Sequence, residues 1–241
     1  MHEAKHWKYN CFVTLTYDDK YLPNPPHLSK EDWQKFIKRL RWAAQTLDGR
    51  ILTEGAGNVR YFGCGEYGEQ NDRPHYHLLL FNCDFADRVL AANGLHESAS
   101  LSELWPFGFH KIGSVSGASA TYVAQYSLKK QGGRTDCDAD GVVRPAAFLR
   151  MSLKPAIGAP WLTEFKADLQ NGYLVNDAIK SAIPRTYVEM LKKKFPRDAE
   201  RVLFAKWKRM QSLDVENFSP ARLKDAEIIH KAKLEESNRS L

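Results

Sequence analysis

Two histidines stand one residue apart at the start of an apolar run, in the segment RPHYHLLLFNCD that covers residues 73–84. Residues i and i+2 of a β-strand project from the same face, so His75 and His77 lie side by side if this run is a strand. Pro74 agrees with that assignment, because proline is tolerated at the first residue of a strand. A neighbouring imidazole pair can chelate a divalent metal ion. The ordinary alternative is two strand-end histidines bonded to backbone or water.

A hard divalent cation also needs an oxygen ligand. Glu66 ends the preceding apolar segment, and a short hairpin would bring its carboxylate beside the two imidazoles. Glu69 and Asp72 are rival acids, but they lie within the connecting loop itself. A triad of alternating histidines is excluded, because Leu79 stands where the third histidine would be.

A second group of chemical residues lies in the segment ASATYVAQYSLKK, residues 118–130. If the segment is helical, Tyr122 and Tyr126 are four residues apart and share a face, with Lys129 and Lys130 following. A phenol, whose pKa is about 10, is a poor nucleophile near neutral pH unless a metal ion or a cation assists it. The alternative is a pair of core tyrosines, but the histidine pair and the upstream acid favour the chemical interpretation.

The local pattern predicts which elements position these groups. Ser29, with Asp32 three residues later, predicts the start of an amphipathic helix. Composition and turn signals predict strands at 11–17, 58–66, 75–81, 108–115 and 148–152. Further helices are predicted at 84–105 (irregular), 118–130, 160–170, 184–195, 198–213 and 219–236, with a loop at 132–140. Proline and glycine in SLKPAIGAP predict two domains, 1–155 and a helical 156–241.

Composition limits the class of protein. Of 241 residues, 43% are hydrophobic and 27% charged, which is typical of a folded globular chain. No apolar run is long enough to cross a bilayer, and the first residues carry no hydrophobic segment of the signal-peptide type, so we expect a cytoplasmic protein without a membrane partner. The four cysteines form no CxxC pair, which argues against a zinc knot.

The net charge of +6 is carried in clusters, several of them beside an aromatic residue. Lysine and arginine neutralise phosphates while aromatic rings stack on bases, a combination that suits single-stranded nucleic acid. Solvated helix faces would give the same pattern. The clusters are Lys35, Lys38, Arg39 and Arg41; Lys129 and Lys130; Lys192 to Lys194; and Lys206, Lys208 and Arg209.

Three segments in this order, FVTLTYDDKYLP, GEYGEQNDRPHYHLLLF and YVAQYSLKK, resemble the three motifs of HUH endonucleases. The likeness is closest to replication initiators of microviruses of the gokushovirus type, and it covers most of the chain. It implies an α+β fold, an HUH-type antiparallel sheet of about five strands with the histidine strand central, flanked by helices and followed by a helical C-terminal extension.

The resemblance also implies roles for particular residues. His75 and His77 match the metal ligands, Glu66 the acidic partner, and Tyr122 and Tyr126 the two nucleophiles. Many members have lysine between the tyrosines where this chain has glutamine at position 125, so Lys129 is our substitute for the assisting cation. We expect DNA contacts from Lys130, Lys206, Lys208 and Arg209.

The implied activity is rolling-circle initiation. With Mg²⁺ or Mn²⁺, one tyrosine would nick single-stranded DNA at the viral origin, forming a 5′-phosphotyrosine link that is later rejoined. No GxxxxGK[ST] motif is present in the sequence, so host helicase and DNA polymerase in the bacterial cytoplasm are the expected partners. Two alternatives remain, a non-catalytic nucleic-acid-binding domain of similar topology and a metal-dependent hydrolase that leaves a free 5′-phosphate.

Overall fold

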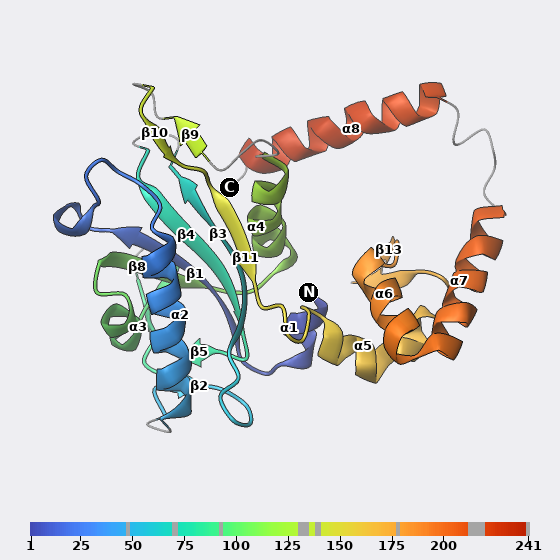
Figure 1. Cartoon of the computed structure of the whole chain (residues 1–241), viewed down its shortest axis with the longest axis horizontal. Coiled ribbons are helices and arrows are strands. Elements are labelled where there is room, and N and C mark those ends of the chain that lie inside the picture. Colours follow the sequence, from blue (N-terminus) through green and yellow to red (C-terminus); the bar gives the residue numbers. More distant parts are fainter. Residues whose placement is uncertain are drawn as a thin grey trace. The chain divides into compact units, whose positions relative to one another are not determined.

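The chain folds into two compact units, Met1–Trp161 and Leu162–Leu241 (Figure 1). The first unit thus ends after residue 155, where the sequence placed the boundary between the two domains. The computed structural model describes residues 1–46, 49–68, 72–91, 94–129, 135–137, 141–176, 179–211 and 220–239.

The first unit is built on an antiparallel sheet of seven strands in the order β11-β3-β4-β1-β8-β7-β6 (Figure 1). The expected α+β class is confirmed. Among the five longer strands, β4, which carries the histidine pair, is the middle one. The longer strands are β1 (Asn10–Tyr17), β3 (Arg60–Tyr67), β4 (Pro74–Phe81), β8 (Gly108–Gly113) and β11 (Phe148–Met151); the two-residue strands are β6 (Val89–Leu90) and β7 (His96–Glu97).

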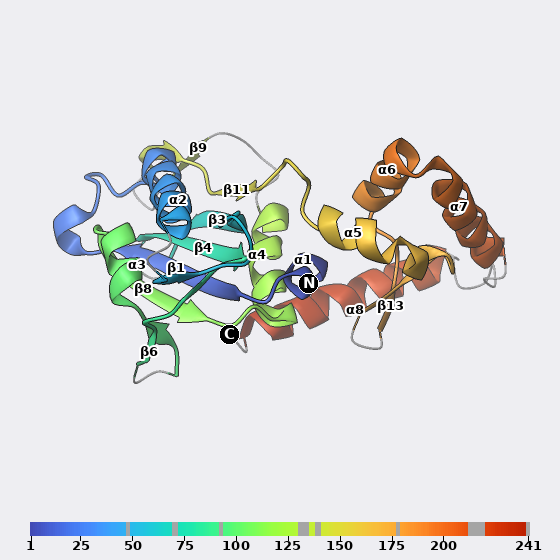
Figure 2. The same ribbon diagram turned by 90° about the horizontal axis from the view of Figure 1, so that it is seen from below.

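One face of the sheet packs against helix α2 (Lys30–Gln45), which Figure 2 shows lying along one side of the strands. The predicted start of α2 is confirmed, since the Ser29 side chain accepts a hydrogen bond from the Asp32 amide. Trp33, Phe36 and Leu40 recur at helical spacing and are buried in the main core. Alternate residues of the strands meet them there: Val13, Leu15 and Tyr17 of β1, and Tyr76, Leu78 and Leu80 of β4.

The opposite face of the sheet packs against helix α4 (Gly117–Lys129), which contacts β3, β4 and β11. A smaller core lies here, in which Val123 of α4 is fully buried against Leu79 and Phe81 of β4 and Cys64 of β3. The short N-terminal helix α1 (His2–His6) supplies Ala4 to the edge of this cluster. The histidine strand is therefore covered on both faces, by α2 on one and by α4 on the other.

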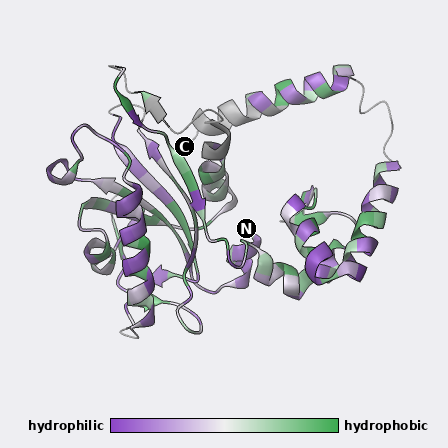
Figure 3. Ribbon diagram, in the orientation of Figure 1, coloured by the Kyte–Doolittle hydropathy of each residue, from purple (hydrophilic) through white to green (hydrophobic). Residues whose placement is uncertain are grey.

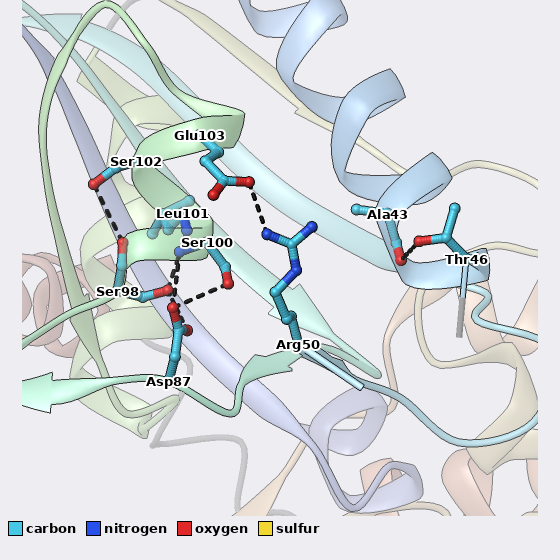
Figure 4. Close-up of polar contacts among 9 residues, drawn as sticks. All are labelled: Ala43, Thr46, Arg50, Asp87, Ser98, Ser100, Leu101, Ser102 and Glu103. Atoms are coloured by element: carbon cyan, nitrogen blue, oxygen red, sulfur yellow. Dashed lines mark hydrogen bonds and ion pairs between the residues drawn. The ribbon is translucent and has the colours of Figure 1, made fainter. Parts of the chain in front are cut away.

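The prediction of an irregular helix over 84–105 was wrong for most of its length. The segment contains β5 (Asp84–Phe85), which pairs with β2 (Ile51–Leu52), then β6, β7 and helix α3 (Ala99–Leu104). Helix α3 begins late because Ser98 caps it, and the Asp87 carboxylate accepts hydrogen bonds from the Ser98 hydroxyl and the Ser100 amide (Figure 4). An acid and serines that bond to nearby backbone compete with continuous helix.

The loop expected at 132–140 was also wrong in part, because Thr135–Cys137 forms strand β9 against β10 (Val143–Pro145). The other positions of that loop, 132–134 and 138–140, lie outside the described residues. This pairing joins two short segments of low strand propensity, so only the contact between them specifies it. The short turn η1 (Asp19–Tyr21) after β1 was likewise not predicted.

The second unit is mainly helical, as the sequence predicted, with a small hairpin that it did not predict. Figure 3 shows hydrophobic and hydrophilic residues alternating along its long helices. None of the described helices is long and apolar enough to cross a membrane. The elements are α5 (Ala159–Phe165), which begins in the first unit, η2 (Lys166–Leu169), the hairpin β12 (Leu174–Asn176) and β13 (Ile179–Ser181), α6 (Arg185–Lys194), α7 (Pro196–Gln211) and α8 (Pro220–Arg239).

Candidate active site

The register of three adjacent strands places the chemical residues on one face of the sheet. Glu66 of β3 lies opposite His75 of β4, and Thr16 of β1 lies opposite the same histidine from the other side. One row further along, His77 has Thr14 as its neighbour on β1. Because side chains of directly paired residues share a face, these groups all lie on the α4 side of the sheet. The intervening Tyr76 points into the main core.

Each histidine is held through its Nδ1 atom by a threonine of β1. Thr14 Oγ1 lies 3.0 Å from His77 Nδ1, and Thr16 Oγ1 lies 3.1 Å from His75 Nδ1. These contacts orient both rings and leave the Nε2 atoms for other partners. Sequence analysis missed the threonines, although a signal was present: TLT and HYH have the same two-residue spacing, and antiparallel pairing aligns them.

The two histidines differ in what their Nε2 atoms meet. His77 Nε2 lies 2.9 Å from Glu66 Oε1, and both side chains are buried, at 8% and 6% exposure. The hydroxyl of Tyr122 donates to the same Glu66 oxygen at 2.9 Å and lies 3.4 Å from His77 Nε2. The Tyr122 and His77 rings meet edge to face at 5.0 Å. The structure thus brings a tyrosine of α4, an acid of β3 and a histidine of β4 into one cluster.

The rival acids are not part of this cluster where they are described. Asp72 accepts a hydrogen bond from Arg144 at 2.9 Å, and that guanidinium also lies over the ring of Tyr67. Glu69 lies outside the described residues. Of the two described candidates, Glu66 is the acid beside the histidine pair.

The surroundings of His75 favour a neutral ring with an accessible nitrogen. Burial lowers the pKa of His75, the nearby His77 lowers it further, and Glu66 acts in the opposite direction. A Cβ atom at Gly68 would come within 2.9 Å of His75 Nε2, so glycine keeps the space beside that nitrogen open. A neutral imidazole with a free nitrogen is the form that binds a metal ion.

The donor set of two imidazoles and one carboxylate fits a divalent cation such as Mg²⁺ or Mn²⁺. Ligands at right angles around such an ion, with bonds of about 2.1 Å, are separated by about 3 Å. The 2.9 Å between Glu66 Oε1 and His77 Nε2 matches that separation. In the described part of the chain, no three His, Cys, Asp or Glu side chains are already arranged to hold an ion. A bound ion would therefore replace the Glu66–His77 hydrogen bond.

The other predicted site residues lie in three different situations. Tyr126 and Lys129 belong to α4, with Tyr126 about one turn after Tyr122, but their side chains are outside the described part. Gln125, between the tyrosines, is buried. Lys130 lies outside the described residues altogether. The remaining three, Lys206, Lys208 and Arg209, are in α7 of the second unit, where the Arg209 guanidinium lies 5.0 Å from the Tyr173 ring centre.

Comparison with known proteins gives consistent results. The chain is 35% identical to replication-associated protein VP4 of Bdellovibrio phage phiMH2K over 81% of its own length and 62% of that protein. It is 36% identical to replication-associated protein ORF2 of Spiroplasma virus 4 over 52% of its length and 40% of the relative. For replication-associated protein ORF4 of Chlamydia phage 1 the values are 24%, 82% and 50%. The chain thus spans from two fifths to about three fifths of these relatives.

No solved structure matches the chain significantly. The family model for replication-associated proteins of the ORF2 type matches residues 10–131, half of the chain. This range includes β1, β3, β4 and α4 up to its end, and hence every residue of the cluster around Glu66. The likeness to phage replication proteins that the three motifs predicted is confirmed. The chain belongs to the family of replication-associated proteins of the ORF2 type.

Proposed function

We propose that this chain initiates rolling-circle replication by nicking single-stranded DNA at a viral origin through a metal-dependent tyrosine transesterification. The observation that carries the proposal is the Tyr122 hydroxyl, hydrogen-bonded to the carboxylate that also contacts His77. A phenol held beside an acid and an imidazole on a replication protein is placed for phosphoryl chemistry rather than for packing alone.

Glu66, His75 and His77 would hold Mg²⁺ or Mn²⁺, with Thr14 and Thr16 orienting the two rings. When bound, the ion would polarise a non-bridging oxygen of the scissile phosphate and offset its developing charge. Coordination through Nε2 requires that the proton of each ring stay on Nδ1. A threonine hydroxyl can both donate and accept, so it serves this tautomer as well as the one that donates to Glu66.

The proposed step is a balanced exchange of one phosphodiester for another. The Tyr122 oxygen attacks phosphorus and gives up its proton, the bond from phosphorus to the 3′-oxygen breaks, and that oxygen takes up a proton. The products are a 5′-phosphotyrosine and a free 3′-hydroxyl. Glu66 Oε1 already accepts the Tyr122 hydrogen bond, so this carboxylate is the nearest group to receive the phenol proton. The energy of the bond is kept in the protein–DNA link, so no nucleotide hydrolysis is needed.

The second tyrosine completes the cycle in this proposal. Tyr126 follows Tyr122 by about one helical turn in α4, and it would cleave the regenerated origin so that the released 3′-hydroxyl can close the first product. Lys129, at the end of the same helix, is the proposed assisting cation. A host polymerase would extend the 3′-end and a host helicase would separate the strands, which places the reaction in the cytoplasm of the host bacterium. Lys130, Lys206, Lys208 and Arg209 are proposed to contact phosphates.

The test uses a single strand that covers the origin of the genome encoding this chain, incubated with Mn²⁺. We expect a covalent adduct whose mass equals protein plus the 5′-phosphorylated fragment, and peptide mapping that identifies Tyr122 or Tyr126. The double variant Tyr122→Phe/Tyr126→Phe should form none. An adduct that persists in the double variant would contradict the assignment of the nucleophile.

Two other outcomes would favour the alternatives. A free 5′-phosphate with no protein-bound DNA would indicate a metal-dependent hydrolase. Origin binding without any metal-dependent nicking would indicate a non-catalytic binding domain. A charge-reversal variant of Lys206, Lys208 and Arg209 tests the second unit separately, because loss of phosphate contacts flattens the salt dependence of binding.

A further inference from the structure

The face of the sheet that carries the histidines continues beyond them onto strand β8. Phe109 pairs with Thr16 and Lys111 pairs with Thr14. The residue between Lys111 and Gly113, Ile112, is buried in the main core on the α2 side, so Phe109 and Lys111 lie on the other side. One cross-strand row therefore runs from Phe109 through Thr16 and His75 to Glu66.

Phe109 is unusual for its position in this row. Its side chain is 62% exposed, whereas Glu66 at the far end of the row is buried. On the same face, Leu79 and Phe81 are covered by the cluster around Val123 of α4. A large exposed aromatic ring on a sheet, beside a candidate active site, contributes little to the core and is available to a ligand.

Lys111 adds a cation next to this ring. Its ammonium pairs with Glu97 of β7, and both side chains are partly exposed, at 34% and 55%. An ion pair exposed to this degree contributes at most about 1 kcal/mol, so a phosphate could replace the carboxylate at small cost. An exposed ring and a lysine on one face are the two components of a single-strand binding surface.

We propose that Phe109 is a stacking platform for a base of the DNA strand that passes the active site, and that Lys111 meets a phosphate beside that base. Two strand spacings separate Phe109 from His75, about 10 Å, which is close enough for a nucleotide near the scissile phosphate. The proposal rests on the proposed function, since it assigns to the nicked strand a path across β1 onto β8. Stacking accepts any base, so this contact contributes affinity and position rather than sequence recognition.

The experiment measures binding without cleavage. Fluorescein-labelled oligo(dT) is titrated with the protein in EDTA, and fluorescence anisotropy gives the dissociation constant. Phe109→Ala should weaken binding roughly 5- to 100-fold, the range expected for losing one base stack. Phe109→Trp should retain affinity, and Phe109→Leu, which stays apolar but has no ring, should bind as poorly as the alanine variant.

The matched control is Trp42→Ala. Trp42 is 70% exposed on α2, the helix that covers the opposite face of the sheet, and its removal should leave the dissociation constant unchanged. A strand with a single 2-aminopurine gives a second readout, since stacking on Phe109 should quench its fluorescence and Phe109→Ala should restore it. Lys111→Gln should lower the slope of log affinity against log salt by roughly one.

Equal binding by wild type and Phe109→Ala would overturn the inference, as would full affinity in Phe109→Leu. If Phe109→Ala instead changes the oligomeric state measured by light scattering, the ring belongs to a contact between copies of the chain, and the inference fails. The adduct assay separates the two levels: an adduct with unchanged Phe109→Ala binding refutes only the platform, whereas weaker binding by Phe109→Ala with no wild-type adduct refutes only the nicking chemistry.

Discussion

The two faces of strand β4 carry opposite kinds of interaction, although their residues alternate one by one along the chain. Tyr76, Leu78 and Leu80 point toward α2 into the larger core, while His75 and His77 point toward α4. The difference is clearest in two tyrosines. The Tyr76 hydroxyl bonds to Tyr17 and to the Ser29 backbone, whereas the Tyr122 hydroxyl bonds to Glu66 beside His77. One face therefore carries stability and the other carries the proposed chemistry.

The largest expected effect is on the stability face. Phe36→Ala removes a fully buried ring from α2, and the free energy of unfolding should fall by about 3–5 kcal/mol in chemical denaturation. Trp42→Ala, in the same helix but exposed, should change it by no more than about 0.5 kcal/mol. The Mn²⁺ affinity of folded Phe36→Ala, measured by calorimetry, should match that of wild type. A large loss of that affinity would mean that the two faces are coupled.

The next effect is on the chemical face. Glu66→Gln keeps the shape of the side chain but removes the charge, so nicking of the origin strand should slow by roughly 100-fold or more, because several kcal/mol of charge stabilisation depend on the ion it helps to hold. Asp72→Asn is the control, since that acid pairs with Arg144 instead. Nicking rates with Mn²⁺ decide the matter, and a greater loss in Asp72→Asn would assign the metal to the wrong acid.

A smaller effect is expected from the threonines that orient the rings. Thr14→Val or Thr16→Val removes one hydroxyl at nearly constant shape, and Mn²⁺ affinity should weaken roughly 10- to 100-fold, as for other outer partners of metal-bound histidines. Calorimetry or the paramagnetic resonance of bound Mn²⁺ measures this without any reaction. Thr→Ser at the same position should restore affinity. Equal loss in the valine and serine variants would point to packing instead of hydrogen bonding.

The smallest effect separates the two tyrosines by pH. Burial is the main cause that raises the pKa of Tyr76, to about 12, above the value of about 10 expected for the unfolded chain. The stabilisation is therefore complete below pH about 10 and is lost as pH rises toward about 12. Tyr76→Phe should cost about 1–2 kcal/mol near neutral pH and flatten this alkaline decline in denaturation experiments.

The exposed Tyr21 provides the comparison for that experiment. Tyr21→Phe should leave both the stability and its alkaline decline as in wild type. An alkaline profile of Tyr76→Phe that is as steep as that of wild type would show that the hydroxyl of Tyr76 does not contribute to the decline.

The elements that carry strong periodicity could be predicted from the sequence. The helix after Ser29, the histidine strand and the helix of the tyrosines all formed where the pattern placed them. The segment 84–105 could not be predicted, because its two-residue strands exist only through pairing with distant partners and Asp87 delays the helix. Local propensity contains no information about such contacts.

The candidate site shows the same limit at the level of single residues. The spacing of His75 and His77 indicated a shared face, and Glu66 and Tyr122 were named before their contacts were known. The choice of Glu66 over Asp72 needed the register of the β3–β4 hairpin, which places Glu66 beside His75. Thr14 and Thr16 needed the pairing of β1 with β4, two strands that are about sixty residues apart in the chain. The exposed Phe109 needed the position of α4, which covers other strands.

The alternation along β4 also limits how this chain can change in evolution. The pleat works like a reading frame of two: an insertion or deletion of one residue within PHYHLLLF would turn the following side chains to the opposite face. An imidazole would then enter the apolar core and the phenol of Tyr76 would meet Glu66. Drift in length is consequently confined to the connections between strands, whereas inside β4 only substitutions that respect parity can persist.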